Sequence, residues 1–162
     1  MMKRTHVAVG LAVTLPLIVN DPIAALGVIG SVAPDFDIAL GLKHRTVTHS
    51  FLAAAATTLL ISPVNIKIAI VWSINYLLHL LLDGATKTGV PLLYPKKKYY
   101  GIMRFKTRDS IDYFIQLMAI AFICLVYLTL KTRNYFWSNF FINIYLFFGS
   151  WYLKTFHLYM AE

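Results

Sequence analysis

Residues 50–83 read SFLAAAATTLLISPVNIKIAIVWSINYLLHLLLD, and this stretch shows the kind of fold that the rest of the chain repeats. It holds two apolar runs, Ser50 to Ile61 and Ile66 to Leu82, separated by Ser62-Pro63-Val64-Asn65. A proline followed by asparagine favours a turn between two regular segments. Lys67 is the one Lys, Arg, Asp or Glu in either run. The stretch therefore predicts a hairpin of two apolar helices.

The same pattern extends to both sides of this hairpin. Before it, apolar runs over His6 to Val19 and Ile23 to Ala33 flank Asn20-Asp21-Pro22, which is again turn chemistry. After it, Ile111 to Leu130 and Tyr135 to Leu153 are about as long as a helix needs to cross a hydrocarbon core of about 30 Å. The sequence predicts an all-α, polytopic membrane bundle of about six helices in three hairpins. The first helices are short, and their lengths suit either spanning or partly inserted helices.

The domain organisation follows from these runs. We expect a single domain in which residues 1–110 form the first two hairpins with a basic loop over 84–110, and residues 111–162 form a C-terminal transmembrane hairpin. The N-terminal apolar run follows Lys3 and Arg4, as a signal peptide would, but it lacks a good cleavage site and is expected to be retained.

Composition supports a membrane protein. Apolar residues make up 59% of the 162 residues and charged residues 14%, and the mean hydropathy is +0.66. A typical soluble domain has about twice as many charged residues, so an ordinary soluble fold, a coiled coil and a disordered chain are excluded. The single cysteine, Cys124, lies inside an apolar run and is expected to be a buried, inert thiol.

Ionisable residues stand at the ends of the apolar runs. Such residues are costly in a membrane and mark a functional site by default. Because the outer ends of a helical hairpin meet, these residues should converge on one side of the membrane. The set with metal-ligand chemistry consists of His6, Asp35, Asp37, His44, His49, His79 and Asp83.

The local spacings suit metal ligation. His79 and Asp83 are four residues apart and share one helical face, with Asn75 one turn earlier as a possible outer partner. Pro34 favours a turn or extended segment for Asp35 and Asp37. Thr48 is a candidate N-cap for the third helix. Histidine and carboxylate ligands fit Zn²⁺ best, with Mn²⁺ or iron as alternatives, and seven ligands suit two ions better than one.

Other polar residues have simpler interpretations. Asp109 and Asp112 are expected to cap the helix that begins near residue 111. His157, near the end of the sequence, is expected to lie outside the site.

The ordered motifs GSVAPDFD (30–37), HRTVTHS (44–50), HLLLD (79–83) and TKTGVPLLYP (86–95) resemble the YdjM/YbcI-like family of inner-membrane, metal-dependent hydrolases. The resemblance covers about residues 4–104 and implies a hydrolase whose substrate is poorly defined. Members often carry glycine after the His-Arg pair, where this chain has Thr46, and the loop geometry can differ there. The family's polar signature falls on His6, Asp35, Asp37, His44, Arg45, His49, Ser50, His79 and Asp83.

Charge sets the expected orientation. Twelve Lys and Arg residues lie on the side of the ionisable residues and three, Lys67, Lys131 and Arg133, on the other. The positive-inside rule therefore places the site and both termini in the cytoplasm. The basic loop also suits an anionic lipid head group or another phosphoester. Nucleic acid is not expected as a partner, because the loop is short and anchored at the bilayer.

The sequence thus predicts a membrane-embedded hydrolase that uses a divalent metal, with a phosphoester such as a phospholipid as substrate. Arg45 would stabilise phosphate charge, and Asp37 and His44 are candidates for proton transfer. Two alternatives use the same polar residues. One is an ion or proton transporter, and the other is a scaffold or regulator in which the metal only holds the helix ends together.

Overall fold

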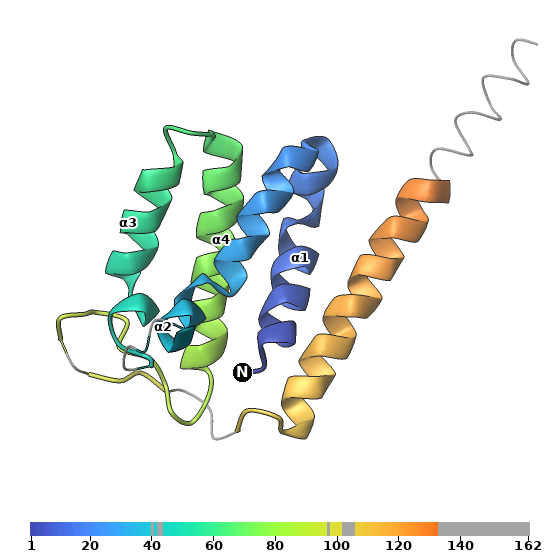
Figure 1. Cartoon of the computed structure of the whole chain (residues 1–162). Helices are drawn as coiled ribbons and strands as arrows, with labels where there is room; N and C mark the ends of the chain where they lie inside the picture. Colours follow the sequence, from blue (N-terminus) through green and yellow to red (C-terminus); the bar gives the residue numbers. More distant parts are fainter. Residues whose placement is uncertain (40, 42–43, 97, 102–105, 133–162) are drawn as a thin grey trace, which may run out of the picture. The chain divides into compact units, whose positions relative to one another are not determined.

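The computed structural model describes residues 1–39, 41, 44–96, 98–101 and 106–132 (Figure 1). The chain separates into two compact units, Met1–Ile123 and Cys124–Glu162. Within the described residues the regular elements are helical, as predicted, apart from one isolated antiparallel bridge between Val90 and Tyr100. In chain order they are α1 (Lys3–Asn20), η1 (Pro22–Ser31), η2 (Ala33–Asp35), α2 (Phe36–Ala39), η3 (Val47–His49), α3 (Phe51–Ile61), α4 (Ile66–Gly84) and an unlabelled helix, Ser110–Thr132.

The first predicted hairpin is formed by α1 and η1. Pro22 begins η1, where its fixed φ and missing N–H cost nothing. Beside it, the Lys67 ammonium donates to Asp21 (2.6 Å), and this hydrogen bond lowers the pKa of that carboxyl. η1 is a 3₁₀ helix of 10 residues, much longer than is usual.

The glycines of η1 explain how closely it packs on α4. Gly27 and Gly30 are three residues apart and lie on one face of a three-residue-per-turn helix. A Cβ on Gly27 would lie 2.6 Å from the Ile68 carbonyl oxygen, and one on Gly30 would lie 2.5 Å from the Trp72 carbonyl oxygen. The backbone of η1 therefore packs directly against the backbone of α4, and the residues that follow η1 are held close to α4.

The second predicted hairpin is formed by α3 and α4, and its caps differ in part from expectation. The Asn65 side chain accepts from the backbone N–H groups of Lys67 and Ile68 at the start of α4. Ser50, not Thr48, caps α3, because its Oγ accepts from the Ala53 N–H (3.2 Å). The prediction for Thr48 was wrong because a short 3₁₀ turn, η3, precedes α3 and delays its start by two residues.

The membrane-length helices are α4 and the Ser110–Thr132 helix, which are long and apolar enough to cross a bilayer. η1 together with residues 33–39 passes the same test as a span bent by 46°. α4 begins at the predicted residue, Ile66, and ends at Gly84, within two residues of the predicted run. The second helix of the predicted C-terminal hairpin, residues 135–153, lies outside the described residues, as does His157.

The Ser110–Thr132 helix begins as predicted with aspartate capping, and one of its aspartates does more. The Asp109 carboxylate accepts from the Ser110 N–H (2.9 Å). Asp112 is fully buried and accepts from the Thr5 hydroxyl (2.7 Å) as well as from the Arg108 N–H (3.0 Å). It therefore joins this helix to α1. The thiol of Cys124 is exposed rather than buried, as is most of this helix.

The packing brings one end of each helix to the same place. In Figure 1 the start of α1, α2 and the last turn of α4 lie at one end, and the turns that follow α1 and α3 lie at the other. Apolar packing is modest: Ala54, Tyr76 and Leu80 form one buried cluster between α3 and α4. Most of the fully buried large side chains are polar, and most of these gather at the first end.

Candidate metal centre

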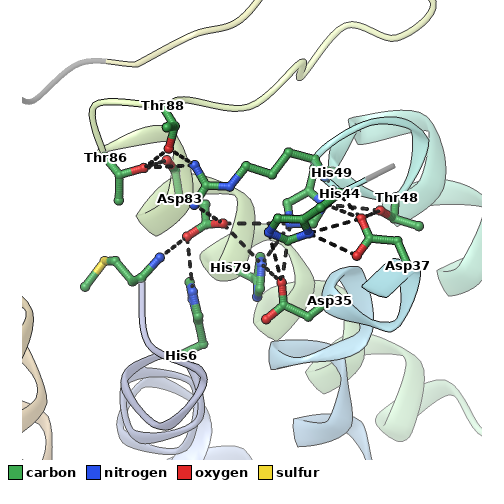
Figure 2. A network of polar contacts seen from close by, with 12 residues as sticks. His6, Asp35, Asp37, His44, Thr48, His49, His79, Asp83, Thr86 and Thr88 are labelled. Atoms are coloured by element: carbon green, nitrogen blue, oxygen red, sulfur yellow. Dashed lines mark hydrogen bonds and ion pairs between the residues drawn. The ribbon is translucent and has the colours of Figure 1, made fainter. Parts of the chain in front are cut away.

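The structure brings the seven predicted ligands together at the shared end of the helices (Figure 2). α1 supplies His6, the η2–α2 turn supplies Asp35 and Asp37, and α4 supplies His79 and Asp83. His44 lies in the loop before η3 and His49 ends η3. All are buried except His44, whose side chain is 39% exposed. We call these seven residues the His/Asp cluster.

Four ligand atoms of the cluster, two imidazole nitrogens and two carboxylate oxygens, lie close together. The Nε2 atoms of His49 and His79 lie 3.3 Å apart. Asp35 Oδ1 lies 3.6 Å from His49 Nε2 and 3.7 Å from His79 Nε2. Asp83 Oδ2 lies 3.7 Å from each of the same two nitrogens. Ligands about 2.0–2.1 Å from a tetrahedral zinc lie about 3.3–3.4 Å from one another, and these five separations are close to that spacing.

The hydrogen bonds behind the two imidazoles show that their lone pairs face this point. His79 Nδ1 lies 2.7 Å from the Ser31 carbonyl oxygen, which can only accept, so Nδ1 carries the proton. The Thr48 hydroxyl donates to Asp37 Oδ2 (2.9 Å) and therefore accepts from His49 Nδ1 (3.1 Å). When both rings are neutral, their Nε2 atoms are unprotonated acceptors, 3.3 Å apart and buried. A shared cation resolves this repulsion, and a carbonyl or carboxylate behind each histidine is the usual arrangement around a metal.

Asp37 lies behind the histidines rather than beside the four atoms. Its Oδ1 lies 3.0 Å from His44 Nδ1, and its Oδ2 accepts from Thr48 and from the Arg45 backbone N–H (3.1 Å). A carboxylate at Nδ1 leaves the Nε2 of His44 free for proton transfer. That Nε2 lies 4.0 Å from Asp35 Oδ1. The structure thus pairs Asp37 with His44 and, through Thr48, with His49.

His6 lies on the other side of Asp83. Its Nε2 is 3.2 Å from Asp83 Oδ1, while Asp83 Oδ2 faces His49 and His79. The Met1 amine also contacts Asp83 Oδ1. The rings of His6 and His79 stack with centroids 3.9 Å apart. Asp83 therefore presents one oxygen to each side, which is how a carboxylate bridges two metal ions.

Arg45 reaches across the cluster from a strained backbone. Its φ is +58°, a left-handed conformation that is uncommon without glycine. The Arg45 Nη2 lies 2.9 Å from Asp83 Oδ2, and Nη1 donates to Thr86 (3.2 Å) and to the Thr88 hydroxyl. Tyr99 donates to the Arg45 carbonyl oxygen (3.2 Å). Strain of this kind, held by contacts on every side, is typical of functional positions.

A cavity of about 660 Å³ opens onto the cluster. Its wall includes Asp35, His44, Arg45 and Asp83, so the candidate ligands and the candidate proton-transfer group can be reached from it. Lys3, Arg4 and Arg108 also line it, which gives four cationic side chains against two carboxylates. We call it the basic cavity. Its charge favours an anionic ligand.

Some partners of the cluster were not predicted from the sequence. Ser31 acts through its carbonyl oxygen, and a backbone atom leaves no signal in residue type. Thr86 and Thr88 hold Arg45, and their only signal was the TKTG motif. Asn75 was considered as an outer partner but instead bonds the Val71 carbonyl oxygen and the Thr14 hydroxyl.

One comparison with known proteins identifies the family. The model of the YdjM inner membrane protein family matches residues 1–156, and the chain therefore belongs to this family. No curated protein matches the chain, and no solved structure does.

Proposed function

We propose that this member of the YdjM inner membrane protein family is a metal-dependent hydrolase of phosphoesters, with a dinuclear His/Asp site, of which zinc is the preferred metal. The observation that supports it most is the pair of Nε2 atoms, on His49 and His79, that lie 3.3 Å apart beside two carboxylate oxygens. One ion would be held by these histidines with Asp35 and Asp83. The second would lie between His6 and the other oxygen of Asp83.

A bound divalent ion supplies two things in such a site: it polarises a phosphoryl oxygen and makes a coordinated water acidic enough to attack at neutral pH. The residues of the chain do the rest. Arg45 presents a planar guanidinium beside Asp83, where charge on a phosphate in the basic cavity would be neutralised. His44 lines the same cavity and, backed by Asp37, gives or takes the proton.

Orientation is part of the proposal. The site lies at the end of the helices where twelve of the fifteen Lys and Arg residues of the sequence were predicted to gather. The positive-inside rule then gives a multi-pass inner-membrane protein with the site and both termini in the cytoplasm. A membrane lipid is the phosphoester that best fits this position, because the basic cavity lies where the membrane helices end, at the level of the lipid head groups.

A second candidate function is favoured by one feature of the same geometry. Four protein ligands around one zinc describe a closed, structural site, whereas catalytic zinc keeps one position open. A single ion at His49, His79, Asp35 and Asp83 would therefore join η2, η3 and α4 without catalysis. This scaffold interpretation expects one ion per chain and no loss of function on replacement of Arg45.

Metal content tests the site directly. We expect about two ions per chain, the number that suits a dinuclear centre, when detergent-purified protein is reconstituted with Zn²⁺ and measured by mass spectrometry. The variant H79A/D83A removes two ligand side chains and should lose the metal. The variant D21A is the matched control, because Asp21 is a partly exposed aspartate at the far end of α1. Absence of stoichiometric metal with either Zn²⁺ or Mn²⁺ would overturn the proposal.

Turnover separates the two candidate functions. Metal-loaded protein should hydrolyse phosphomonoesters or phosphodiesters, and R45A should lower the rate while it keeps the metal. One ion per chain, with no turnover of any phosphoester, would support the scaffold.

A further inference from the structure

We infer that the substrate of the proposed hydrolase is a lipid whose hydrocarbon chain lies in an apolar groove between α1 and the Ser110–Thr132 helix, while its phosphate enters the basic cavity. The inference rests on the proposed function for its chemistry. The groove itself stands on separate observations.

The groove has a volume of about 380 Å³ and is lined entirely by apolar side chains. α1 contributes one wall and the Ser110–Thr132 helix contributes the other. The lining residues are Val9, Ala12, Val13, Pro16, Ile115, Ala119 and Phe122. Beside it, Ala8, Ala12 and Ala119 pack together as a buried cluster. Because these contacts are made by alanine, the two helices approach closely at the floor of the groove.

The groove and the basic cavity lie along the same two segments of chain. The basic cavity is lined by Lys3 and Arg4 at the start of α1. Thr107 and Arg108, just before the Ser110–Thr132 helix, line it as well. At 1.5 Å per residue, the groove begins about 7 Å beyond Arg4 along α1 and continues for about 10 Å more. Both helices begin at the basic cavity and run away from it, so a charged end and an apolar end are aligned in one direction.

Hydrogen bonds to the Asp112 carboxylate link the two walls. Thr5 donates to the buried Asp112 carboxylate (2.7 Å), at a level between the two cavities. The Asp112 carboxylate also accepts from the backbone N–H of Met2 (3.1 Å) and that of Arg108 (3.0 Å). This link ties together the segments that carry the basic residues and the segments that line the groove. The lipid would then pass along the outer side of the Thr5–Asp112 link.

These features select an anionic lipid phosphoester over a soluble one and over a zwitterionic lipid. A soluble phosphoester would use the basic cavity alone and leave the apolar groove without a role. A zwitterionic head group would bring a cation next to Lys3, Arg4 and Arg108. A lipid with an exposed phosphate satisfies both ends, because each basic residue near a membrane surface attracts an anionic lipid by about 1 kcal/mol.

The test is photolabelling with a phosphatidic acid that carries a diazirine in its acyl chain, in phosphatidylcholine nanodiscs. We expect labels on peptides that contain residues 9–16 and 115–122. The variant V13W places a large ring in the groove at a side chain that is 52% exposed, and it should lower this labelling. Loss of contact with about two methylenes corresponds to about tenfold in affinity. The control L60W adds the same ring to α3, at a side chain 75% exposed, and should leave the labelling unchanged.

Two outcomes would overturn the inference: labels spread evenly over the membrane helices, or labelling in the groove that V13W does not reduce. Labelling needs no turnover, so it is read independently of the hydrolase proposal. In a parallel assay, V13W should raise KM for a long-chain phosphoester, whereas L60W should leave hydrolysis of both a long-chain and a short, soluble phosphoester unchanged. Specific labelling without any hydrolysis would keep the lipid site and reject the hydrolase. Hydrolysis of the soluble ester with labels spread evenly would keep the hydrolase and reject the lipid site.

Discussion

At the scale of single residues, the centre depends on groups that hold the histidines as much as on the ligands themselves. His79 is oriented by a carbonyl oxygen of η1, and His49 by Thr48, which in turn is held by Asp37. Each contact places a proton on Nδ1, so that the lone pair of the neutral ring lies on Nε2. Removing such a contact should weaken the metal site and leave the fold in place, since no ligand is lost.

The variant T48V tests this at His49. It keeps the size of the side chain but removes the hydroxyl between His49 Nδ1 and Asp37, so we expect zinc affinity to fall by about 10- to 100-fold. Competition with a chromophoric chelator measures the change. The matched control is T58V, because the Thr58 hydroxyl bonds only the Ala54 carbonyl oxygen within its own helix among the described contacts. Equal zinc affinity in T48V and wild type would show that Thr48 does not orient His49.

His44 should separate catalysis from metal binding. It is the most exposed member of the His/Asp cluster, and its Nδ1 is engaged by Asp37. We expect H44Q to lower kcat by about 10²- to 10⁴-fold, the usual contribution of a proton-transfer group, with unchanged metal content. The two readouts on one sample are steady-state hydrolysis and mass spectrometry of the metal. Loss of metal in H44Q would make His44 a ligand instead.

At the scale of elements, the way η1 rests on α4 decides whether the centre forms. Gly27 and Gly30 let η1 approach α4 to backbone contact, and the next residues, Ser31 to Asp35, are thereby delivered to His79. The hairpins and the convergence of their ends were predictable, because apolar runs, turn residues and helical periodicity can all be recognised from the amino-acid types. The 3₁₀ form of η1 was not, since GVIGS fits an α-helix equally well and packing on α4 decides between them.

Other errors at this scale have the same origin. Ser50 and Thr48 both suit an N-cap, and only the position of η3 selects Ser50. Cys124 was expected to be buried because its neighbours are apolar, but apolar sequence alone does not distinguish a lipid-facing side chain from a core one. The sequence predicted only a basic loop after α4, yet Val90 and Tyr100 exchange two backbone hydrogen bonds that fold this loop back over Arg45. Long-range backbone pairing of this kind leaves little trace in residue type.

The variant G30A tests the contact between η1 and α4. Its methyl group would lie 2.5 Å from the Trp72 carbonyl oxygen, which belongs to backbone and cannot move aside. We expect it to lower the free energy of unfolding by about 1–3 kcal/mol, as overpacking does. The control is G84A at the end of α4, where the nearest atom is 3.6 Å away and alanine should gain about 0.5–1 kcal/mol. Thermal unfolding in detergent compares the two, and equal melting temperatures would rule out the close packing.

At the scale of the whole molecule, sequence charge and helix ends give one orientation. The His/Asp cluster, the basic cavity and the starts of α1 and of the Ser110–Thr132 helix lie together. The turn between α3 and α4 lies at the end of these two helices, α3 and α4, that is farther from the His/Asp cluster (Figure 1). Because twelve of the fifteen Lys and Arg residues of the sequence are predicted on the first side, the positive-inside rule expects that side in the cytoplasm. Cytoplasmic exposure would give the centre access to cellular metal and to the inner leaflet.

Cysteine accessibility in intact cells tests that orientation with little disturbance. C124S removes the native thiol, after which V64C places one in the turn between α3 and α4, at a side chain that is 81% exposed. A membrane-impermeant maleimide should label V64C from outside, if α3 and α4 cross the bilayer with the site inside. K96C, in the loop after α4, should react only after permeabilisation, because it lies on the side of the basic cavity. Labelling of K96C in intact cells would place the site outside. Protection of V64C in cells whose K96C is also protected would mean that the hairpin enters the membrane without crossing it, since both ends would then face the cytoplasm or the bilayer.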